Sequence, residues 1–177
     1  MKPIILKFKV PKFDNSLYLD KDGVLNVALI RSGKLSSPRK LDEIYLKKDL
    51  SDIENFANKN HYNLIMVSNQ PDLSRNLIDL KFLRENINKI KSKLDLSIAI
   101  ICPHVESENC NCRKPKIGMI HTYRKLFPNK YKKELFIGDQ ESDYLCSINL
   151  GIKFIKVNSS TSNSNFINED LLKIGNN

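Results

Sequence analysis

Two aspartates, one residue apart, follow a short apolar run near the start of the chain. The run covers residues 17–19, Asp20 and Asp22 come next, and Gly23 follows at once. Such a run is typical of a buried strand, and open α/β folds bind ligands at the carboxyl ends of their strands. Two carboxylates this close repel each other unless a cation or a protonated partner lies between them. The residues therefore indicate a cation site, although an ordinary Asp-Gly turn has the same sequence.

Two later apolar runs also end in polar residues. Ser68, Asn69 and Gln70 close one of them, and Asp139 closes the other after a single glycine. In a parallel sheet the carboxyl ends of the strands gather on one edge. We therefore expect these side chains to meet the Asp20 pair there.

Lys114 adds a fixed positive charge to this set. Carboxylate oxygens of Asp20, Asp22 and Asp139 suit Mg²⁺ better than a transition metal. Such a site favours phosphoryl transfer, in which catalysis is mostly positioning and neutralisation of charge. One carboxylate can attack phosphorus, and the second can protonate the leaving oxygen and then activate water. No phosphate-binding loop of the Gly-x-x-x-x-Gly-Lys type is present, so ATP use is not indicated.

A second cluster holds soft ligands. Cys102, His104, Cys110 and Cys112 lie within eleven positions. Three thiolates and one imidazole suit a closed tetrahedral Zn²⁺ site of the structural kind, and the alternative is reduced cysteines in a loop. Cys146 lies outside this cluster and is expected to be a small core residue.

Alternating strands and helices must position these residues. We expect strands at residues 17–19, 63–68, 97–102, 134–137 and 153–157, and helices at 51–59, 78–94, 116–126 and 142–150. A capping box of Ser51 and Glu54 opens the first helix, and residues 27–46 are expected to form a polar loop. The alternation predicts the α/β class, with a Rossmann-like parallel sheet sandwiched by helices.

The chain of 177 residues is expected to form a single domain, with its core at about residues 16–157. Residues 158–177 form a tail, with a helical turn at 169–174. The formal net charge is +9, but the lysines are scattered, so a solvated basic surface and a nucleic-acid face both explain it. Residues 1–11 do not resemble a secretion signal, and no apolar run approaches the ~20 residues of a membrane span. A cytoplasmic monomer is the expectation.

The motifs resemble those of the haloacid dehalogenase superfamily of phosphatases. They are Asp20-Lys-Asp-Gly-Val, Ser68-Asn, the lysine of Arg113-Lys-Pro, and Gly-Asp139-Gln-Glu-Ser-Asp143, in the superfamily's order.

The resemblance implies roles for these residues. Asp20 would be the nucleophile and Asp22 the acid/base. Asp20, the backbone carbonyl of Asp22, and Asp139 would bind Mg²⁺, while Ser68 and Lys114 would hold the phosphoryl group. A further aspartate of the last motif, residue 143, would either support the metal site or cap its helix.

The zinc loop runs directly into Arg-Lys-Pro. This arrangement is similar to one subgroup, the essentially capless phosphatases of heptose 1,7-bisphosphate and of histidinol phosphate. The likeness implies substrate contacts from six residues: Ser68, Asn69, Gln70, Arg75, Arg113 and Lys114. For Arg75 a solvated surface charge is the alternative.

The chain departs from the subgroup in three places. Lys21 stands where arginine is usual, and Pro71 and Asp72 replace Ser-Gly. Residues 27–31 lack the Asp-His-Gly-Tyr of typical heptose enzymes. Because that stretch contacts substrate in the subgroup, substrate identity stays open.

The expected function is therefore a Mg²⁺-dependent sugar-phosphate phosphatase acting through an aspartyl phosphate. Its expected partner is a sugar bisphosphate. The expected reaction removes the 7-phosphate of heptose bisphosphate, as a step in cell-surface polysaccharide synthesis. Histidinol phosphate is the alternative substrate. A DNA 3′-phosphatase is a more distant one, because no basic stripe with interleaved aromatics is present. A catalytically dead scaffold would need a missing catalytic residue, and none is missing.

Overall fold

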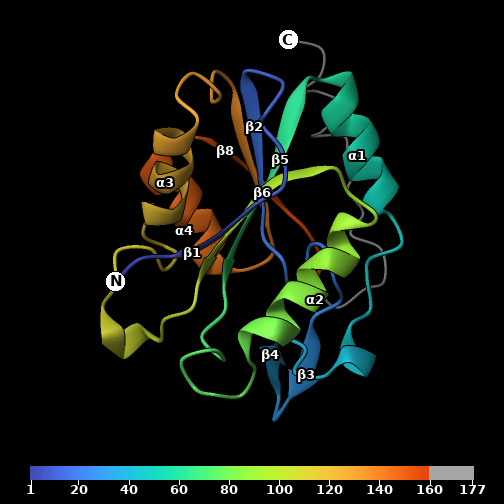
Figure 1. Ribbon diagram of the computed structural model, residues 1–177, viewed down its shortest axis with the longest axis vertical. Helices are drawn as coiled ribbons and strands as arrows, with labels where there is room; N and C mark the ends of the chain where they lie inside the picture. Colours follow the sequence, from blue (N-terminus) through green and yellow to red (C-terminus); the bar gives the residue numbers. More distant parts are fainter. Residues whose placement is uncertain (160–177) are drawn as a thin grey trace.

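A six-stranded sheet forms the centre of the molecule in the computed structural model, which describes residues 1–159. The strands lie in the order β1-β6-β5-β2-β7-β8 (Figure 1). Their bounds are Ile4–Lys7 (β1), Asn15–Leu19 (β2), Tyr62–Asn69 (β5), Leu96–Cys102 (β6), Glu134–Gly138 (β7) and Lys153–Lys156 (β8). All neighbouring strands are parallel except β1, which pairs with β6 in the antiparallel sense. The predicted α/β class with a mainly parallel sheet is confirmed.

Helices cover both faces of this sheet (Figure 1). Their bounds are Leu50–Lys59 (α1), Leu80–Lys91 (α2), Gly118–Leu126 (α3) and Glu141–Leu150 (α4). Successive residues of a strand point to opposite faces. Accordingly, Leu17 and Leu19 of β2 pack in the core beneath α1 and α2, whereas Tyr18 packs in the core beneath α3 and α4.

The strand order makes β2 the topological switch point. In the sheet β2 lies between β5 and β7, and Leu19 at its end pairs with Met66 of β5 and with Ile137 of β7. The chain proceeds from β2 to one side of the sheet through β5 and β6, and then crosses to the other side for β7 and β8. Open α/β sheets bind ligands where the order reverses in this way. Asp20, the next residue after β2, is therefore at the position where the fold favours a site.

Residues 27–46 contain a β-hairpin, so their prediction as a polar loop is wrong. The strands are β3 (Leu29–Arg31) and β4 (Lys34–Ser36), joined by Ser32 and Gly33, both with positive φ. A two-residue turn with two positive φ angles matches the right-handed twist of the strands it joins. Each strand has only three residues, too few to show an alternating pattern, and the Ser-Gly pair was the only signal of the turn.

Two further expectations need correction. β1 was not predicted, and it adds an antiparallel edge strand to a sheet expected to be wholly parallel. The predicted capping box is wrong, because Asp49 is the N-cap of α1 and Ser51 lies inside the helix. Leu50, which is only 4% exposed, begins this helix, and its burial in the core accounts for the earlier start.

Cys146 is a buried core residue on α4, as predicted. The tail beyond residue 159, including the helical turn expected at 169–174, lies outside the described residues. Within residues 1–159, no helix is long and apolar enough to cross a membrane.

Candidate active site

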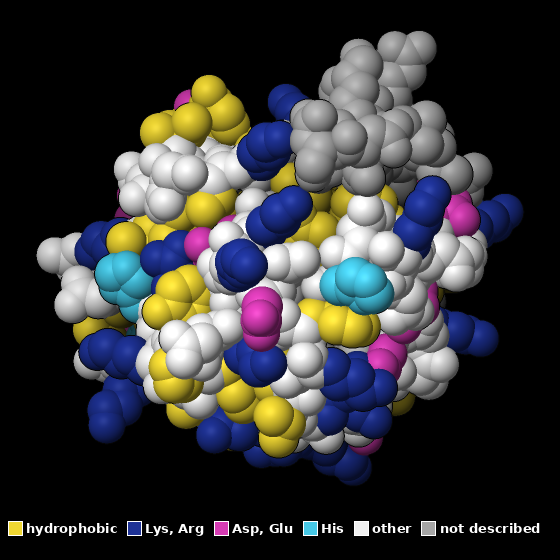
Figure 2. All heavy atoms as spheres, turned by 90° about the horizontal axis from the view of Figure 1, so that it is seen from above, with side chains coloured by type: hydrophobic (Ala, Val, Ile, Leu, Met, Phe, Trp, Pro, Cys, Tyr) yellow, Lys and Arg dark blue, Asp and Glu magenta, His cyan; other side chains and the backbone are white. Residues whose placement is uncertain are grey.

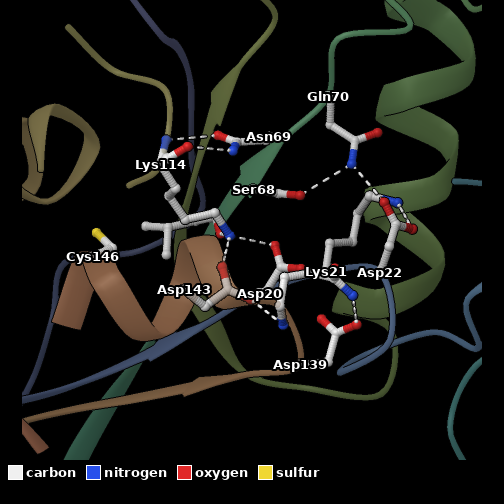
Figure 3. A network of polar contacts seen from close by, with 12 residues as sticks. Asp20, Lys21, Asp22, Ser68, Asn69, Gln70, Lys114, Asp139, Asp143 and Cys146 are labelled. Carbon is white, nitrogen blue, oxygen red and sulfur yellow. Dashed lines mark hydrogen bonds and ion pairs between the residues drawn. The ribbon is translucent and has the colours of Figure 1, made fainter. Parts of the chain in front are cut away.

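The ammonium group of Lys114 lies against the aspartate that ends β2. Its Nζ is 2.7 Å from Oδ1 of Asp20 and 2.6 Å from Oδ1 of Asp143, and it also donates to the carbonyl of Val67 at 3.0 Å (Figure 3). All three charged side chains are buried. Burial raises the pKa of Asp20 to about 7, although the Lys114 ammonium opposes this shift. One cation therefore offsets part of the charge of two buried carboxylates.

Asp139 at the end of β7 brings a third carboxylate to this point. One oxygen each from Asp20, Asp139 and Asp143 lies within 4.8 Å of the others. Oδ1 of Asp139 is buried and receives no hydrogen bond from the described part of the chain. Burial raises the pKa of Asp139 to about 6, against the effect of a hydrogen bond from Gln140. A hard divalent cation such as Mg²⁺ fits this set, because it prefers oxygen ligands and would relieve the repulsion among them.

Gly23 leaves room for this arrangement. Its φ is +91°, and a Cβ on this residue would lie 2.5 Å from Oδ2 of Asp139. Glycine is therefore required both by the turn and by the close approach of the carboxylate.

Asp22 points away from the three carboxylates (Figure 3). Its Oδ1 accepts hydrogen bonds from Lys21 at 2.5 Å and Asn26 at 2.8 Å. Its Oδ2 accepts from Ser37 at 2.6 Å and Gln70 at 2.7 Å. Burial alone would raise the pKa of Asp22, but the adjacent Lys21 ammonium and these hydrogen bonds hold it below its ordinary value. The described chain thus stabilises Asp22 as a carboxylate.

Residues at the end of β5 contact both Lys114 and Asp22. Asn69 accepts a hydrogen bond from the backbone N–H of Lys114 at 3.0 Å and donates to the carbonyl of the same residue at 3.1 Å. This pair of bonds fixes the backbone that carries the buried lysine. Gln70 donates to Ser68 Oγ at 3.0 Å as well as to Asp22. Asn69 and Gln70 therefore orient other site residues.

A cavity of about 290 Å³ opens over these groups. Asp20, Asp139 and Lys114 line its buried part. Two arginines, Arg75 and Arg113, also line it, and the Arg75 side chain is 53% exposed. The cavity therefore runs from a buried group of carboxylates to a more exposed, basic region.

The four predicted soft ligands converge beside the site. Sγ of Cys102 is 3.5 Å from Sγ of Cys110 and 3.5 Å from Nδ1 of His104, and that nitrogen is 3.2 Å from Sγ of Cys112. A tetrahedral Zn²⁺ with Zn–S bonds of about 2.3 Å separates its sulfur ligands by about 3.8 Å. The cluster is buried and close to this size, so the donor set fits Zn²⁺. The next residue after it, Arg113, donates to the carbonyl of His104 at 3.1 Å.

The structure brings most of the predicted site residues together. Asp20, Asp139 and Lys114 meet as expected, but the side chain of Asp22 is not part of the carboxylate group. Ser68 and Gln70 lie beneath the site and are not among the residues that line the cavity.

Three contacts of the site were not foreseen. Asp143 serves both expected alternatives in part, because it accepts from the backbone N–H of Gln140 at the start of α4 and pairs with Lys114. The hydrogen bonds that Asn26 and Ser37 donate to Asp22 were not predicted. The signal for Asn26 was a polar residue directly after the apolar pair at residues 24–25, whereas Ser37 gave none.

The family model described as polynucleotide kinase 3 phosphatase matches residues 20–169, which is most of the chain. The chain belongs to this family. Its members are phosphatases by description, which agrees with the phosphatase chemistry expected from the motifs.

Curated relatives resemble the chain at about 30% identity. The histidine biosynthesis bifunctional protein HisB of Campylobacter jejuni is 31% identical over 153 residues, covering 79% of this chain and 40% of the relative. The chain thus spans less than half the length of that relative. The D-glycero-beta-D-manno-heptose-1,7-bisphosphate 7-phosphatase of Helicobacter pylori is 29% identical over 147 residues, covering 79% of this chain and 81% of the relative.

Solved structures share the fold. A HAD-like phosphatase of Mesorhizobium loti superposes with a TM-score of 0.71 at 20% identity, covering 85% of this chain and 77% of the other. The D,D-heptose 1,7-bisphosphate phosphatase of B. bronchiseptica, complexed with magnesium and phosphate, gives a TM-score of 0.67 at 22% identity, covering 92% and 87%. The fold expected from the resemblance to the haloacid dehalogenase superfamily is confirmed.

Proposed function

We propose that the chain is a Mg²⁺-dependent phosphomonoesterase that acts on a sugar bisphosphate through an aspartyl-phosphate intermediate. The observation that carries this proposal is the meeting of Asp20, Asp139 and Lys114 in the buried part of a cavity whose exposed part is basic. A carboxylate group with one ammonium can hold a metal and a phosphoryl group together, and catalysis of phosphoryl transfer consists largely of such positioning. The domain as a whole, residues 1–177, is taken to be this single catalytic unit.

Asp20 is the proposed nucleophile. Its carboxylate oxygen attacks phosphorus, the bond to the sugar oxygen breaks, and an acyl phosphate forms on Asp20. Asp20, the backbone carbonyl of Asp22, and Asp139 would hold Mg²⁺, which would neutralise charge on the phosphoryl oxygens. Lys114 neutralises further charge there, because its ammonium is 2.7 Å from the Asp20 oxygen.

Asp22 is the proposed acid and base. It gives a proton to the leaving sugar oxygen in the first step and takes one from water in the second, when the water attacks the phosphorus of the acyl phosphate and frees phosphate from Asp20. The lowered pKa of Asp22 favours the carboxylate form, which the second step requires. An anionic phosphoryl group bound next to Asp22 acts against that shift and favours the protonated form needed in the first step.

The similarity to the heptose 1,7-bisphosphate phosphatase supports a sugar bisphosphate as the substrate. The match covers 81% of that relative's length. Histidinol phosphate is the second candidate, because HisB is similar at 31% identity. The family description raises a polynucleotide 3′-phosphate as a third. On the face opposite the β3–β4 hairpin, which lies away from the cavity, lysines and arginines lie in separate groups between neutral side chains (Figure 2). Such scattering is typical of a solvated basic surface.

The deciding experiment measures phosphate release with and without Mg²⁺. The panel contains both anomers of heptose 1,7-bisphosphate, histidinol phosphate and a 3′-phosphorylated oligonucleotide, with Asp20→Asn as the blank. We expect Mg²⁺-dependent release that is fastest from one heptose anomer. Faster release from histidinol phosphate or from the oligonucleotide would overturn the substrate, and release that persists in Asp20→Asn would overturn the mechanism.

A further inference from the structure

The exposed part of the cavity carries an arginine that the motifs do not account for. Arg39 follows the β3–β4 hairpin in sequence and lines the cavity with Arg75 and Arg113. The acidic side chain among them is Asp72. Three guanidinium groups and one carboxylate leave this region with a positive charge, whereas the buried part holds the carboxylates of the catalytic group.

Asp72 holds Arg39 in place. Its Oδ2 accepts from Nε of Arg39 at 2.7 Å, and its Oδ1 accepts from Nη1 of Arg75 at 3.1 Å. The side chain of Asp72 is only 7% exposed, whereas that of Arg39 is 33% exposed. Within the described part of the chain, the guanidinium of Arg39 makes its hydrogen bond through Nε, so its two terminal nitrogens are left to bind a ligand in the cavity that Arg39 lines. A guanidinium fixed through one edge is ready to bind an anion through the other.

This contact involves one of the places where the sequence departs from its subgroup. Asp72 belongs to the altered loop after β5, and Arg39 follows the divergent segment after Asp22. The two residues are far apart in the chain, yet they form an ion pair at the cavity. The altered loop after β5 therefore fixes an arginine from a separate stretch of the chain.

We propose that Arg39, held by Asp72, is a specificity-determining residue that binds a second phosphate of the substrate. The inference rests on the proposed phosphatase function and narrows its substrate to molecules with two phosphates. A phosphate oxygen pair matches the fork of a guanidinium, and the bond is charge-assisted. Histidinol phosphate carries an amine and an imidazole at its other end, so its cationic end meets like charges in this region.

The test compares pairs of substrates that differ by one phosphate. For heptose 1,7-bisphosphate and heptose 7-phosphate, the ratio of kcat/KM values measures the preference for the second phosphate. We expect Arg39→Ala to lower this ratio at least about tenfold, mainly through KM, because a charge-assisted hydrogen bond is lost. Arg39→Lys, which keeps the charge without the fork, should restore part of the preference. Arg84→Ala is the matched control, since Arg84 is exposed on α2 and does not line the cavity.

The outcomes distinguish a failure of this inference from a failure of the proposed phosphatase function. An unchanged kcat/KM ratio in Arg39→Ala overturns the inference, and so does a wild-type enzyme that does not prefer the bisphosphate. In either case, Mg²⁺-dependent phosphate release from p-nitrophenyl phosphate would still support the proposed phosphatase function. Absence of Mg²⁺-dependent release from every phosphomonoester overturns the proposed function itself. The wild type could instead prefer a 3′-phosphorylated oligonucleotide over p-nitrophenyl phosphate and lose this preference in Arg39→Ala. That result overturns the proposal that the second phosphate belongs to a sugar bisphosphate.

Discussion

Lys114 and Asp143 form a buried ion pair, with Nζ 2.6 Å from Oδ1 and side chains that are 3% and 1% exposed. Lys114 follows the cysteine-rich loop, and Asp143 lies in the first turn of α4. The same ammonium pairs with Asp20 at the end of β2. One lysine thus ties the loop, a helix and the central strand together, and its removal should affect both stability and chemistry.

Replacing Lys114 by alanine should therefore have two effects. It leaves Asp20 and Asp143 buried without their cation, and the loss of one partner from a buried pair typically costs about 3–5 kcal/mol in the free energy of unfolding. It also raises the barrier to phosphate release by a few kcal/mol, because a group that stabilises charge on the phosphoryl oxygens is gone. Chemical denaturation and phosphate-release kinetics measure the two effects. Added Mg²⁺ should restore part of the stability, and a variant with wild-type turnover would show that another residue supplies the charge.

Asp20→Asn should abolish turnover and keep the fold. The amide cannot form an acyl phosphate, so we expect kcat to fall roughly a thousandfold or more. Because burial raises the pKa of Asp20 to about 7, a neutral side chain of the same shape is well tolerated here. The melting temperature without Mg²⁺ should then equal or exceed that of the wild type. Residual turnover near the wild-type rate would remove Asp20 as the nucleophile.

The stability without added Mg²⁺ should depend on pH with a definite sign. The pKa of Asp20 is raised to about 7 and that of Asp139 to about 6, both above the ordinary value of about 3.9 in an unfolded chain. At pH values between the unfolded and the folded pKa values, the folded chain therefore binds more protons than the unfolded chain. The free energy of unfolding then falls as the pH rises through this range.

Thermal unfolding between about pH 5 and about pH 8 measures this slope. Excess Mg²⁺ should stabilise the chain more at the upper end, because the metal needs deprotonated carboxylates. Asp139→Asn should reduce the slope by removing one of the two groups. A melting temperature that does not vary with pH in the wild type would contradict the raised pKa values.

The cysteine cluster predicts about one zinc per chain, since four ligands close a structural site. Cys110→Ser should lower the bound zinc, as measured by elemental analysis of the purified protein, and should lower the melting temperature as well. Cys146→Ser is the matched control, because Cys146 is buried outside the cluster. Equal zinc in Cys110→Ser and wild type would refute the assignment.

The sequence by itself determined the parts that local pattern controls. Buried parallel strands are continuous apolar runs, so Leu17–Leu19 and its counterparts were recognisable, as was the order of the strand ends that carry Asp20 and Asp139. The spacing from Cys102 to Cys112 indicated a metal cluster, because all four side chains lie within eleven positions, at the end of β6 and in the segment that follows it. The three-residue strands of the hairpin lacked any such pattern.

Only the tertiary structure decided which side chains meet across the sheet edge. Asp143 could cap its helix or reach the site, and its position against Lys114 follows from the packing of α4 beside β7. The same holds for Asp22, whose carboxylate is turned away by donors from three different segments, and for Arg39, whose partner Asp72 lies on another loop. Apart from the bond from the neighbouring Lys21, these contacts join residues at least 15 positions apart in sequence. Their energies depend on burial and distance, which residue types and spacing do not specify.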